Sequence, residues 1–487
     1  MNKLFLSLLL TLFAAMASAN DSIYARMVEE LHENSLPLVN LTVDPTALSR
    51  SSFVDGEIEI SDYHCRTRHD AVTVSYRCKL RIRGVTASSY DKKSFAVKLV
   101  DDDGKDLDAN ILGIREENSW ILDAMAIDRT RMRNRVCFDI WNELSRTPYE
   151  TRYDGRNGTE GIFVEVFING DYHGLYCMTD KIDRSLLGLK KAKKVADGEV
   201  EIYGLLYKGI NWDSGHNLLS YEQSNTDSST WNAWELQYPE DYPSAITWQP
   251  LMDLIDFCSP STSDYTFRQE YRDYFYDDNL LDYMIFTLAL NVGDNAYKNT
   301  FLSVADITEG HCFLLTPWDM DMSLGGNWDG SYDDVLSDVN RYNHIAPFNR
   351  LYVQNIDSFA DRLKSRWADY QHTLFSPERV NTILDHYGKS FITSGAWARE
   401  VSKWDGNPVP LSASVMDELE YVKSWYTRNH KHLCKELGTG SSIEIQESLC
   451  HSEFTVYTLD GRKLDAANLE NLPKGIYISG GKKVVRK

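Results

Sequence analysis

The spacing of hydrophobic residues changes along the chain, and this change restricts the possible folds more than any other feature. Val39, Leu41 and Val43 alternate with polar residues, which is the two-residue period of a half-buried strand, and Pro45 marks its end. Beyond about residue 245, apolar residues recur mainly at helical spacing. The sequence therefore predicts an α+β protein with a β-rich first half and an α-rich second half.

Further strands and helices follow from the same patterns. Asn169-Gly170 between two apolar runs predicts a β-hairpin. Met132, Val136, Ile140 and Leu144 lie on one face of a predicted helix, and Asp128 is placed near its N-terminus. The other strands are predicted at 72–83, 94–100, 162–168, 175–178, 300–304 and 312–315, and the other helices at 265–292, 348–375 and 415–433.

Length and charge exclude some classes of protein. A chain of 487 residues allows about two to four structural units. Its 72 Asp and Glu exceed its 51 Lys and Arg and give a net charge of −21. Because such a surface repels phosphate backbones, we expect no general binding of nucleic acid.

The first nineteen residues have the features of a signal peptide. Lys3 precedes an almost wholly apolar stretch, and Ala17-Ser18-Ala19 offers the small residues of a cleavage site before Asn20. No later run is long and apolar enough for a membrane-spanning helix. We therefore expect an exported protein without a membrane span, in the periplasm, at the cell surface or secreted.

The end of the chain reads as a separate small module. Residues 438–443 have the composition of a linker, and residues 444–487 contain short strand patterns around Asp460-Gly461 and Lys474-Gly475. This all-β module resembles the C-terminal sorting modules of the Bacteroidetes type IX secretion pathway. A β-module without a sorting role is the alternative.

Cysteines give no catalytic or metal-binding pattern. None of the eight lies in a C-x-x-C pair or at zinc-like spacing, and several stand in apolar strand-like contexts. We expect core cysteines rather than disulfides, although export permits disulfides and the sequence does not determine any pairing. Motifs of P-loop NTPases, Rossmann enzymes, zincins and α/β-hydrolases are also absent from the sequence.

What remains is a group of acidic residues beside apolar segments. Asp319 and Asp321 follow an apolar run, and on an extended segment both point to the same face. Two neighbouring buried carboxylates need a cation or hydrogen-bond donors, and Mg²⁺ or Mn²⁺ takes such oxygen ligands. The alternative is that Asp319 caps a helix or pairs with an arginine. Asp294 and Asn299 are five residues apart, the offset between the catalytic Asp and the metal-binding Asn of protein kinases.

Taken together, these motifs resemble the spore-coat protein H (CotH) kinase family, over about residues 36–437. The motifs that carry the resemblance are Arg83-Gly84 followed by Lys92-Lys93-Ser94, Asp128 to Asn134, Asn169-Gly170 to Tyr176, Leu206-Tyr207-Lys208, Asp294 to Asn299, and Pro317 to Asp321 ending at Gly325. The resemblance implies an atypical protein-kinase-like fold, with a β-rich N-terminal half and an α-rich C-terminal half. Two departures are Asp180, where the family often has Glu, and Val85-Thr86, where it has Asn-x-Ser after Arg-Gly.

The same resemblance implies an exported kinase that transfers the γ-phosphate of ATP to Ser or Thr of extracytoplasmic proteins. Asp294 would orient the acceptor hydroxyl as the catalytic residue, and Asn299, Asp319 and Asp321 would hold Mg²⁺ or Mn²⁺. A lysine, assigned to Lys93, would neutralise the nucleotide phosphates. The remaining residues assigned to nucleotide binding are Arg83, Arg133 and Asp180.

A second hypothesis is a non-catalytic adhesin or glycan-binding protein on the same fold. Aromatic residues such as Trp212, Trp231, Trp234 and Trp248 are candidates for stacking on sugars. The sequence leaves the physiological substrate and the oligomeric state open.

Overall fold

The computed structural model describes residues 22–63, 72–149, 155–195, 199–211, 216–239, 246–296 and 298–439, and four strand segments near the C-terminus. The predicted signal peptide with its cleavage site, and most of the predicted linker at 438–443, lie outside the described residues. The described chain forms two compact units, residues 1–430 and 431–487.

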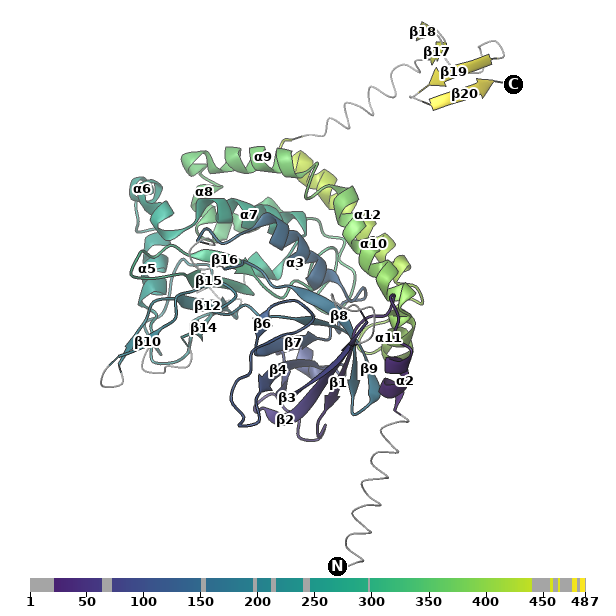
Figure 1. Cartoon of the computed structure of the whole chain (residues 1–487). Helices are drawn as coiled ribbons and strands as arrows, with labels where there is room; N and C mark the ends of the chain where they lie inside the picture. Colours follow the sequence, from purple (N-terminus) through teal and green to yellow (C-terminus); the bar gives the residue numbers. More distant parts are fainter. Residues whose placement is uncertain are drawn as a thin grey trace, which may run out of the picture. The chain divides into compact units, whose positions relative to one another are not determined.

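A closed β-barrel forms the first part of the larger unit (Figure 1). Its strands, in the order in which they pair, are β1 Leu38–Thr42, β2 Val54–Asp62, β3 Val72–Arg83, β4 Ser94–Val100, β7 Ser119–Asp123, β9 Asp171–Thr179 and β8 Gly161–Ile168. Only β1 and β8 pair in parallel among these barrel strands; the other pairs are antiparallel.

Alternation along the strands explains the barrel. Cys78 and Leu80 of β3 point into the apolar interior, whereas Arg77, Lys79 and Arg81 point outward. The predicted strands at 72–83 and 94–100 coincide with β3 and β4. The predicted hairpin at Asn169-Gly170 joins β8 and β9, and both turn residues have positive φ, as a two-residue hairpin of this kind requires.

A second sheet stands beside the barrel. It has the order β13 Thr230–Trp231, β14 Trp234–Tyr238, β12 Leu205–Gly209, β15 Thr300–Val304 and β16 Leu314–Pro317, with all neighbours antiparallel. The two-stranded pieces are β5 Ala109–Asn110 with β6 Glu116–Glu117, and β10 Lys193–Lys194 with β11 Val200–Glu201. Sequence patterns predicted β15 and part of β16, but not β12 to β14 as one sheet.

Helices fill most of the second half of the chain, so the predicted α+β organisation is confirmed. They are α2 Ile23–Glu29, α3 Arg133–Leu144, α5 Gln249–Cys258, α6 Asp264–Tyr274, α7 Asp277–Ala289, α8 Phe348–Leu351, α9 Phe359–Tyr370, α10 Pro377–Thr393, α11 Ala396–Trp404 and α12 Val415–Glu436. The largely apolar α7 packs on β16, and α11 packs on β9 (Figure 1).

Helix α3 begins where the sequence predicted. The Asp128 carboxylate accepts hydrogen bonds from the backbone N–H groups of Met132 at 2.8 Å and Arg133 at 2.7 Å, and it pairs with the Arg133 guanidinium. Burial opposes the charge, yet Arg133 and the backbone donors keep the pKa of Asp128 below its usual value. The first turn of α3, which carries Asn134, is therefore fixed in position.

A buried ionic group connects α11 to the barrel. Both Lys92 and Arg131 donate to the same oxygen of Glu400, at 2.6 and 2.8 Å, and all three side chains are fully buried. The other Glu400 oxygen accepts from the backbone N–H of Leu175 in β9 at 2.7 Å. One carboxylate thus joins three segments that are distant in the sequence. We call Lys92, Arg131 and Glu400 the buried ionic triad.

The smaller unit contains an antiparallel four-stranded sheet. Its strands are β17 Val456–Thr458, β18 Lys463–Leu464, β19 Gly475–Ser479 and β20 Lys482–Arg486, in the order β18-β17-β19-β20. A sorting role for this sheet and the predicted boundary at 437–438 stay predictions. Within the described part of the chain, no helix is long and apolar enough to cross a membrane.

Five of the six described cysteines are buried, as expected for core cysteines, and Cys78, Cys137, Cys177, Cys258 and Cys312 are free thiols. Cys65 and Cys450 lie outside the described residues. Three of the tryptophans that suggested glycan binding, Trp231, Trp234 and Trp248, are also in the core, each no more than 2% exposed. Trp212 lies outside the described residues.

The second sheet predicts a sensitivity to acid. His216 is 5% exposed, stacks on Trp234 and has no hydrogen-bond partner on either ring nitrogen, and burial lowers its pKa from 6.5 to about 3. Below pH 6.5 the unfolded chain binds a proton that the native state does not, so stability is lost as pH falls through this window. When the pH is lowered from 7 to 5, the free energy of unfolding of wild type should fall by about 2 kcal/mol more than that of His216→Phe, as measured by urea denaturation. An unchanged pH dependence would contradict this.

Candidate functional site

A cleft of about 1020 Å³ lies between the barrel and the second sheet. One wall is the outer face of the barrel, where β3 ends at Arg83 and β7 ends at Asp123. The opposite wall comes from the second sheet and includes Lys208 of β12 and Phe301 of β15. Charged residues such as Arg83 and Asp123 stand at the ends of apolar strands. They therefore lie at the edge of the barrel that faces the second sheet.

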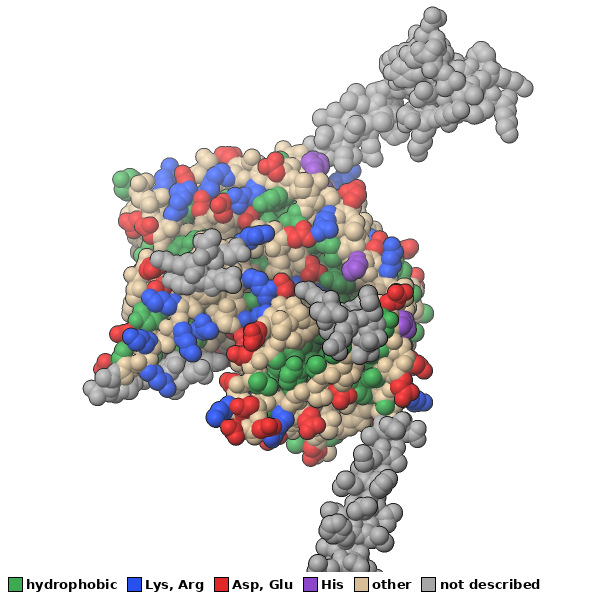
Figure 2. All heavy atoms as spheres, viewed as in Figure 1, with side chains coloured by type: hydrophobic (Ala, Val, Ile, Leu, Met, Phe, Trp, Pro, Cys, Tyr) green, Lys and Arg blue, Asp and Glu red, His purple; other side chains and the backbone are tan. Residues whose placement is uncertain are grey.

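The described lining contains more cations than carboxylates, although the chain as a whole is acidic. Acidic and basic side chains are interspersed on the described surface that Figure 2 shows. The charged lining residues are Arg50, Arg81, Arg83, Lys98, Arg135, Lys181, Lys208 and Lys298, with Asp123, Glu235, Asp294, Asp319 and Asp321. Such a lining suits a polyanionic ligand that brings a cation with it.

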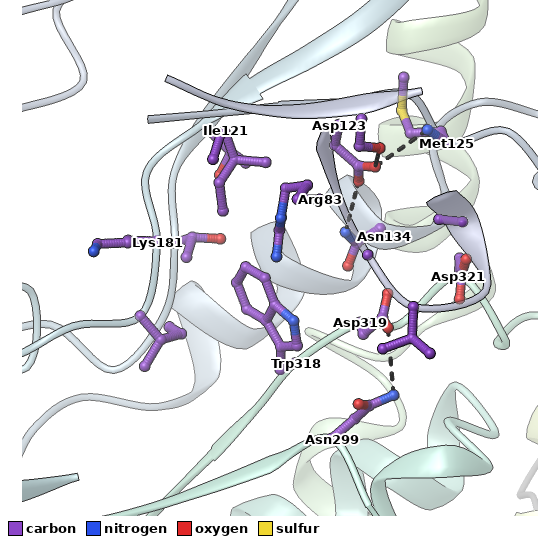
Figure 3. Close-up of a pocket in the computed structure, with 18 of the residues that line it drawn as sticks. Arg83, Ile121, Asp123, Met125, Asn134, Lys181, Asn299, Trp318, Asp319 and Asp321 are labelled. Carbon is purple, nitrogen blue, oxygen red and sulfur yellow. Dashed lines mark hydrogen bonds between the residues drawn. The ribbon is translucent and has the colours of Figure 1, made fainter. Parts of the chain in front are cut away.

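Asp294, Asn299 and Asp319 converge, as their motifs predicted. The Asn299 Nδ2 donates to the Asp294 carboxylate at 3.2 Å and to the Asp319 carboxylate at 3.5 Å. The second of these interactions is drawn in Figure 3. Asp294 lies in a 3₁₀ turn, Asp294–Ala296, and its carboxylate pairs with Lys298 at 3.0 Å.

Asp321 also lines the cleft, but the local geometry differs from the prediction. The prediction of an extended segment from Asp319 to Asp321 is wrong, because β16 ends at Pro317 and Asp319 has a φ of +58°. The chain turns at Asp319, so the two carboxylates do not follow a strand alternation. The alternative that Asp319 caps a helix is also wrong, since it precedes no helix.

Two asparagines hold this acidic segment in place. Asn295 makes two hydrogen bonds to the backbone of Trp318, from its Nδ2 to the carbonyl at 2.9 Å and from the Trp318 N–H to its Oδ1 at 3.1 Å. Asn134 of α3 accepts from the Met320 N–H at 3.1 Å. It also donates to Asp123 at 3.2 Å, as Figure 3 shows. The segment is therefore anchored to the barrel side and to the Asp294 turn at once.

Burial and mutual repulsion raise the pKa of the carboxylates. Burial raises the pKa of Asp319, which Lys208 partly offsets and Asp123 reinforces. The pKa of Asp321 is raised still further by burial and by Asp319 and Asp123. Burial also raises the pKa of Asp294, against the effect of Lys298. These groups would be stabilised as carboxylates by an added cation.

The donor set fits a hard divalent cation. In the described part of the chain no three Asp, Glu, His or Cys side chains are arranged as a complete metal site. Mg²⁺ is usually bound through one or two carboxylates and completed by water and phosphate oxygens. Asp319 and Asn299, with Asp321 nearby, supply oxygen donors of that kind, since the oxygen and nitrogen of an asparagine amide are exchanged by rotation.

Two basic side chains and one aromatic side chain also line the cleft near the acids. Burial and the nearby Arg83 lower the pKa of Lys208, whereas Asp319 and Glu235 favour its charged form. Burial lowers the pKa of Arg83, which Asp123 and Asp319 oppose. The Arg83 guanidinium stands 5.5 Å from the ring centre of Trp318, which is 8% exposed and lines the cleft.

Three residues assigned to nucleotide binding are not among the described residues that line the cleft. Arg133 is buried in its ion pair with Asp128. The Lys93 ammonium donates to the Ser88 carbonyl at 2.9 Å. Asp180 is fully buried and pairs with Arg156 at 3.0 Å and Arg115 at 3.2 Å. The cleft is lined by the other residues that the sequence assigned to the site, which are Arg83, Asp294, Asn299, Asp319 and Asp321.

The sequence assigned no role to Asp123, Asn134 or Lys208. Asp123 directly follows the apolar strand residues Ile121 and Leu122, the same pattern that drew attention to Asp319. Asn134 and Lys208 were each noted as part of a motif, but only the fold brings them to the acids. The position of an acid at the end of an apolar strand is the feature that would have identified Asp123.

Comparison with protein families gives the decisive match. The family model described as CotH kinase protein covers residues 80–433, which is most of the chain and contains every residue discussed for the cleft except Arg50. The chain belongs to the CotH kinase family. A comparison with curated proteins gives no match.

Membership in the CotH family supports a kinase-like function, and kinases in general use ATP with a divalent cation. It also favours a protein as the phosphate acceptor. Within the CotH match, the strands, the hairpin and the acidic motifs appear in the order in which they were identified.

Lys93 and Lys208 form a matched pair for a binding test. Because Lys208 faces the cleft beside Asp319 and Lys93 does not line it, Lys208→Gln should weaken ATP binding in the presence of Mn²⁺ by about tenfold or more. Lys93→Gln should bind ATP as wild type does. Isothermal titration of both variants measures this, and the reverse order of effects would restore Lys93 as the phosphate ligand.

The repulsion among the carboxylates predicts a stabilising substitution. Since the native pKa of Asp321 is raised, ionising it costs native stability, and this cost appears as pH rises above the unfolded value of 3.8. Without a divalent cation, Asp321→Asn should therefore raise Tm at pH 7, and the gain should shrink towards pH 4. Thermal unfolding in EDTA at several pH values tests this. A variant less stable than wild type at pH 7 would show that Asp321 is already neutralised by the protein.

Proposed function

We propose that this protein is a protein kinase that transfers the γ-phosphoryl group of ATP to a Ser or Thr hydroxyl of an extracytoplasmic protein. The observation that carries the proposal is the convergence of Asp294, Asn299 and Asp319 in one cleft. Arg83 and Lys208 line the same cleft. Phosphoryl transfer needs positioning and charge neutralisation more than covalent chemistry, and these residue types supply both. The predicted signal peptide is the basis for placing the reaction outside the cytoplasm.

Each residue has a role in this scheme. Asp294 orients the acceptor hydroxyl and accepts its proton as the new P–O bond forms and the bond to ADP breaks. Its raised pKa suits a proton acceptor, and Lys298 at 3.0 Å keeps its carboxylate oriented. Asn299, Asp319 and Asp321 would hold Mg²⁺ or Mn²⁺, which neutralises and aligns the phosphate oxygens when bound. Arg83 and Lys208 offset the remaining phosphate charge.

The kinase-like architecture is part of this proposal. In protein kinases the catalytic Asp and a metal-binding Asn follow at an offset of five, and a second metal-binding Asp comes after a further strand. Asp294 and Asn299 here precede β15, and Asp319 follows β16, its antiparallel partner. The adhesin hypothesis has less support, since the described candidate tryptophans are in the core.

Two alanine variants should separate metal binding from chemistry. Asp319→Ala removes a carboxylate that would hold the cation, so it should weaken Mn²⁺-dependent ATP binding and abolish transfer. Asp294→Ala should keep ATP affinity near wild type and lose about 10²- to 10⁴-fold in turnover, because only the positioned base is lost. Thermal shift with ATP and Mn²⁺, beside transfer of labelled phosphate to Ser/Thr-rich proteins, measures both.

The exposed Asp369→Ala on α9 is the control for removing a surface carboxylate, and it should match wild type in both assays. Equal loss of ATP binding in the Asp294 and Asp319 variants would contradict the division of roles. A wild-type protein with no Mn²⁺-dependent response to ATP would rule out this site as a kinase site.

A further inference from the structure

The two ends of the cleft differ in chemistry. Figure 3 shows Ile121 and Lys181 on one side of Arg83 and Trp318, and Met125 and Asp321 on the other. Basic residues also line the cleft, among them Arg81, Lys98, Lys181 and Lys208. The apolar and aromatic residues of the lining include Val85, Tyr90, Met125, Ile127, Met322 and Trp328; Met125 lies on the Asp321 side of the cleft in Figure 3, and Met322 directly follows Asp321 in the chain. We call these six residues the apolar end.

Two side chains of the apolar end are strongly exposed. Val85 is 78% exposed and Trp328 is 63% exposed, although both line the cleft. Tyr90, in the same loop as Val85, also lines the cleft, and its pKa is raised by burial and by the charges of Asp321 and Asp329, the residue after Trp328. An exposed indole in the lining of a cleft is a suitable contact for a partner, since Trp is among the residue types enriched at binding hot spots.

The turn that carries Trp328 is firmly held. The Asn327 carbonyl accepts from the Gly330 N–H at 2.9 Å, and the Asn327 N–H donates to the Ser331 carbonyl at 3.1 Å. Arg129 donates to the Gly330 carbonyl at 2.8 Å. A Cβ at Gly330 would lie 2.3 Å from a Val409 methyl group, so the turn also packs closely on its neighbour. The backbone of the turn that presents Trp328 is therefore fixed, so the turn itself has little ordering entropy left to lose on binding.

The geometry of phosphoryl transfer assigns the two ends. The attacking and leaving oxygens lie roughly in line through the transferred phosphorus, so acceptor and nucleotide approach from opposite sides. Arg83, which lies on the other side of Asp319 from Asp321 in Figure 3, suits the nucleotide phosphates together with Lys208. The acceptor then enters past Asp321, which is the apolar end.

We propose that the apolar end binds the acceptor polypeptide, with Trp328 packing against an apolar side chain that flanks the phosphorylated Ser or Thr. This inference rests on the proposed kinase function and adds to it a preference in the acceptor sequence. Val85, in the barrel loop after Gly84, offers a second exposed apolar side chain of the lining for this contact.

The test uses the full chain and a set of peptides with one central Ser in a Gly/Ala background. Each flanking position is varied in turn among Leu, Phe, Ala, Asp and Lys. Equilibrium binding of each peptide and Mn²⁺-dependent phosphate transfer from ATP are measured separately for wild type, Trp328→Ala and Val335→Ala. Val335 is a matched control, because it is 66% exposed on the same segment but is not among the described lining residues.

Wild type and Val335→Ala should favour Leu or Phe at one flanking position, in binding and in kcat/KM. Trp328→Ala should lose about tenfold or more of that preference, mainly through a higher KM for the peptide, with its thermal shift by ATP and Mn²⁺ retained. The same preference in Trp328→Ala, or none in wild type, overturns the inference. Loss of ATP binding instead of peptide binding in Trp328→Ala would place the nucleobase at Trp328 and also overturn it.

The two readouts also separate this inference from the proposed function. If wild type binds apolar-flanked peptides in a Trp328-dependent manner but transfers no phosphate, the docking site stands and the kinase activity fails. If wild type transfers phosphate without regard to the flanking residue, the kinase activity stands and the docking site fails.

Discussion

The position of the barrel relative to the helices depends on the buried ionic triad of Lys92, Arg131 and Glu400. Two cations share one carboxylate oxygen away from water, and the second oxygen is used by the backbone of β9. Removing one partner of such a group leaves an unpaired buried charge, which typically costs about 3–5 kcal/mol. Arg131 also donates to the carbonyls of Met125 and Ala126, which precede α3, so the triad determines where Asp123 and Asn134 stand relative to the rest.

The carboxyl pKa values of the triad and of the cleft are shifted in opposite directions. In the triad every carboxylate oxygen has a donor from the protein, and Lys92 and Arg131 keep the pKa of Glu400 low despite burial. In the cleft, Asp319 and Asp321 have raised pKa values because burial and neighbouring carboxylates outweigh the nearby cations. The Glu400 carboxylate is satisfied by the fold itself, whereas the carboxylates of the cleft would be stabilised by an added cation. This contrast between neighbouring charge clusters is what distinguishes a structural site from a binding site here.

The sequence predicted those parts of the site that are encoded locally. Asp294 and Asn299 are five residues apart on one turn, so their proximity needs little tertiary information, and their convergence with Asp319 follows from the pairing of β15 with β16. The adjacent Lys92-Lys93 pair could not be resolved in this way. Which of the two lysines faces inward depends on Glu400, about 300 residues later, and in fact neither reaches the cleft.

The same limit explains the other differences. Asp123 and Lys208 belong to different β-structures, and only the packing of barrel against sheet brings them to one cleft. The extended geometry expected at Asp319 failed because a positive φ at a non-glycine residue leaves no trace in a hydrophobic pattern. Strand periodicity, in contrast, is a local property, and it located β3, β4 and the β8–β9 hairpin correctly.

The anchoring of the Trp318–Asp321 segment by Asn134 and Asn295 has a consequence for how activity is controlled. Moving this segment out of the cleft, as in a switchable loop, would break the three hydrogen bonds that the Asn134 and Asn295 side chains make to its backbone. It would also expose the largely buried Trp318. These contacts favour the arrangement in which the acids line the cleft. In the proposed kinase, the rate of transfer would then follow the supply of nucleotide, cation and acceptor, in the manner of a constitutive enzyme rather than a signalling switch.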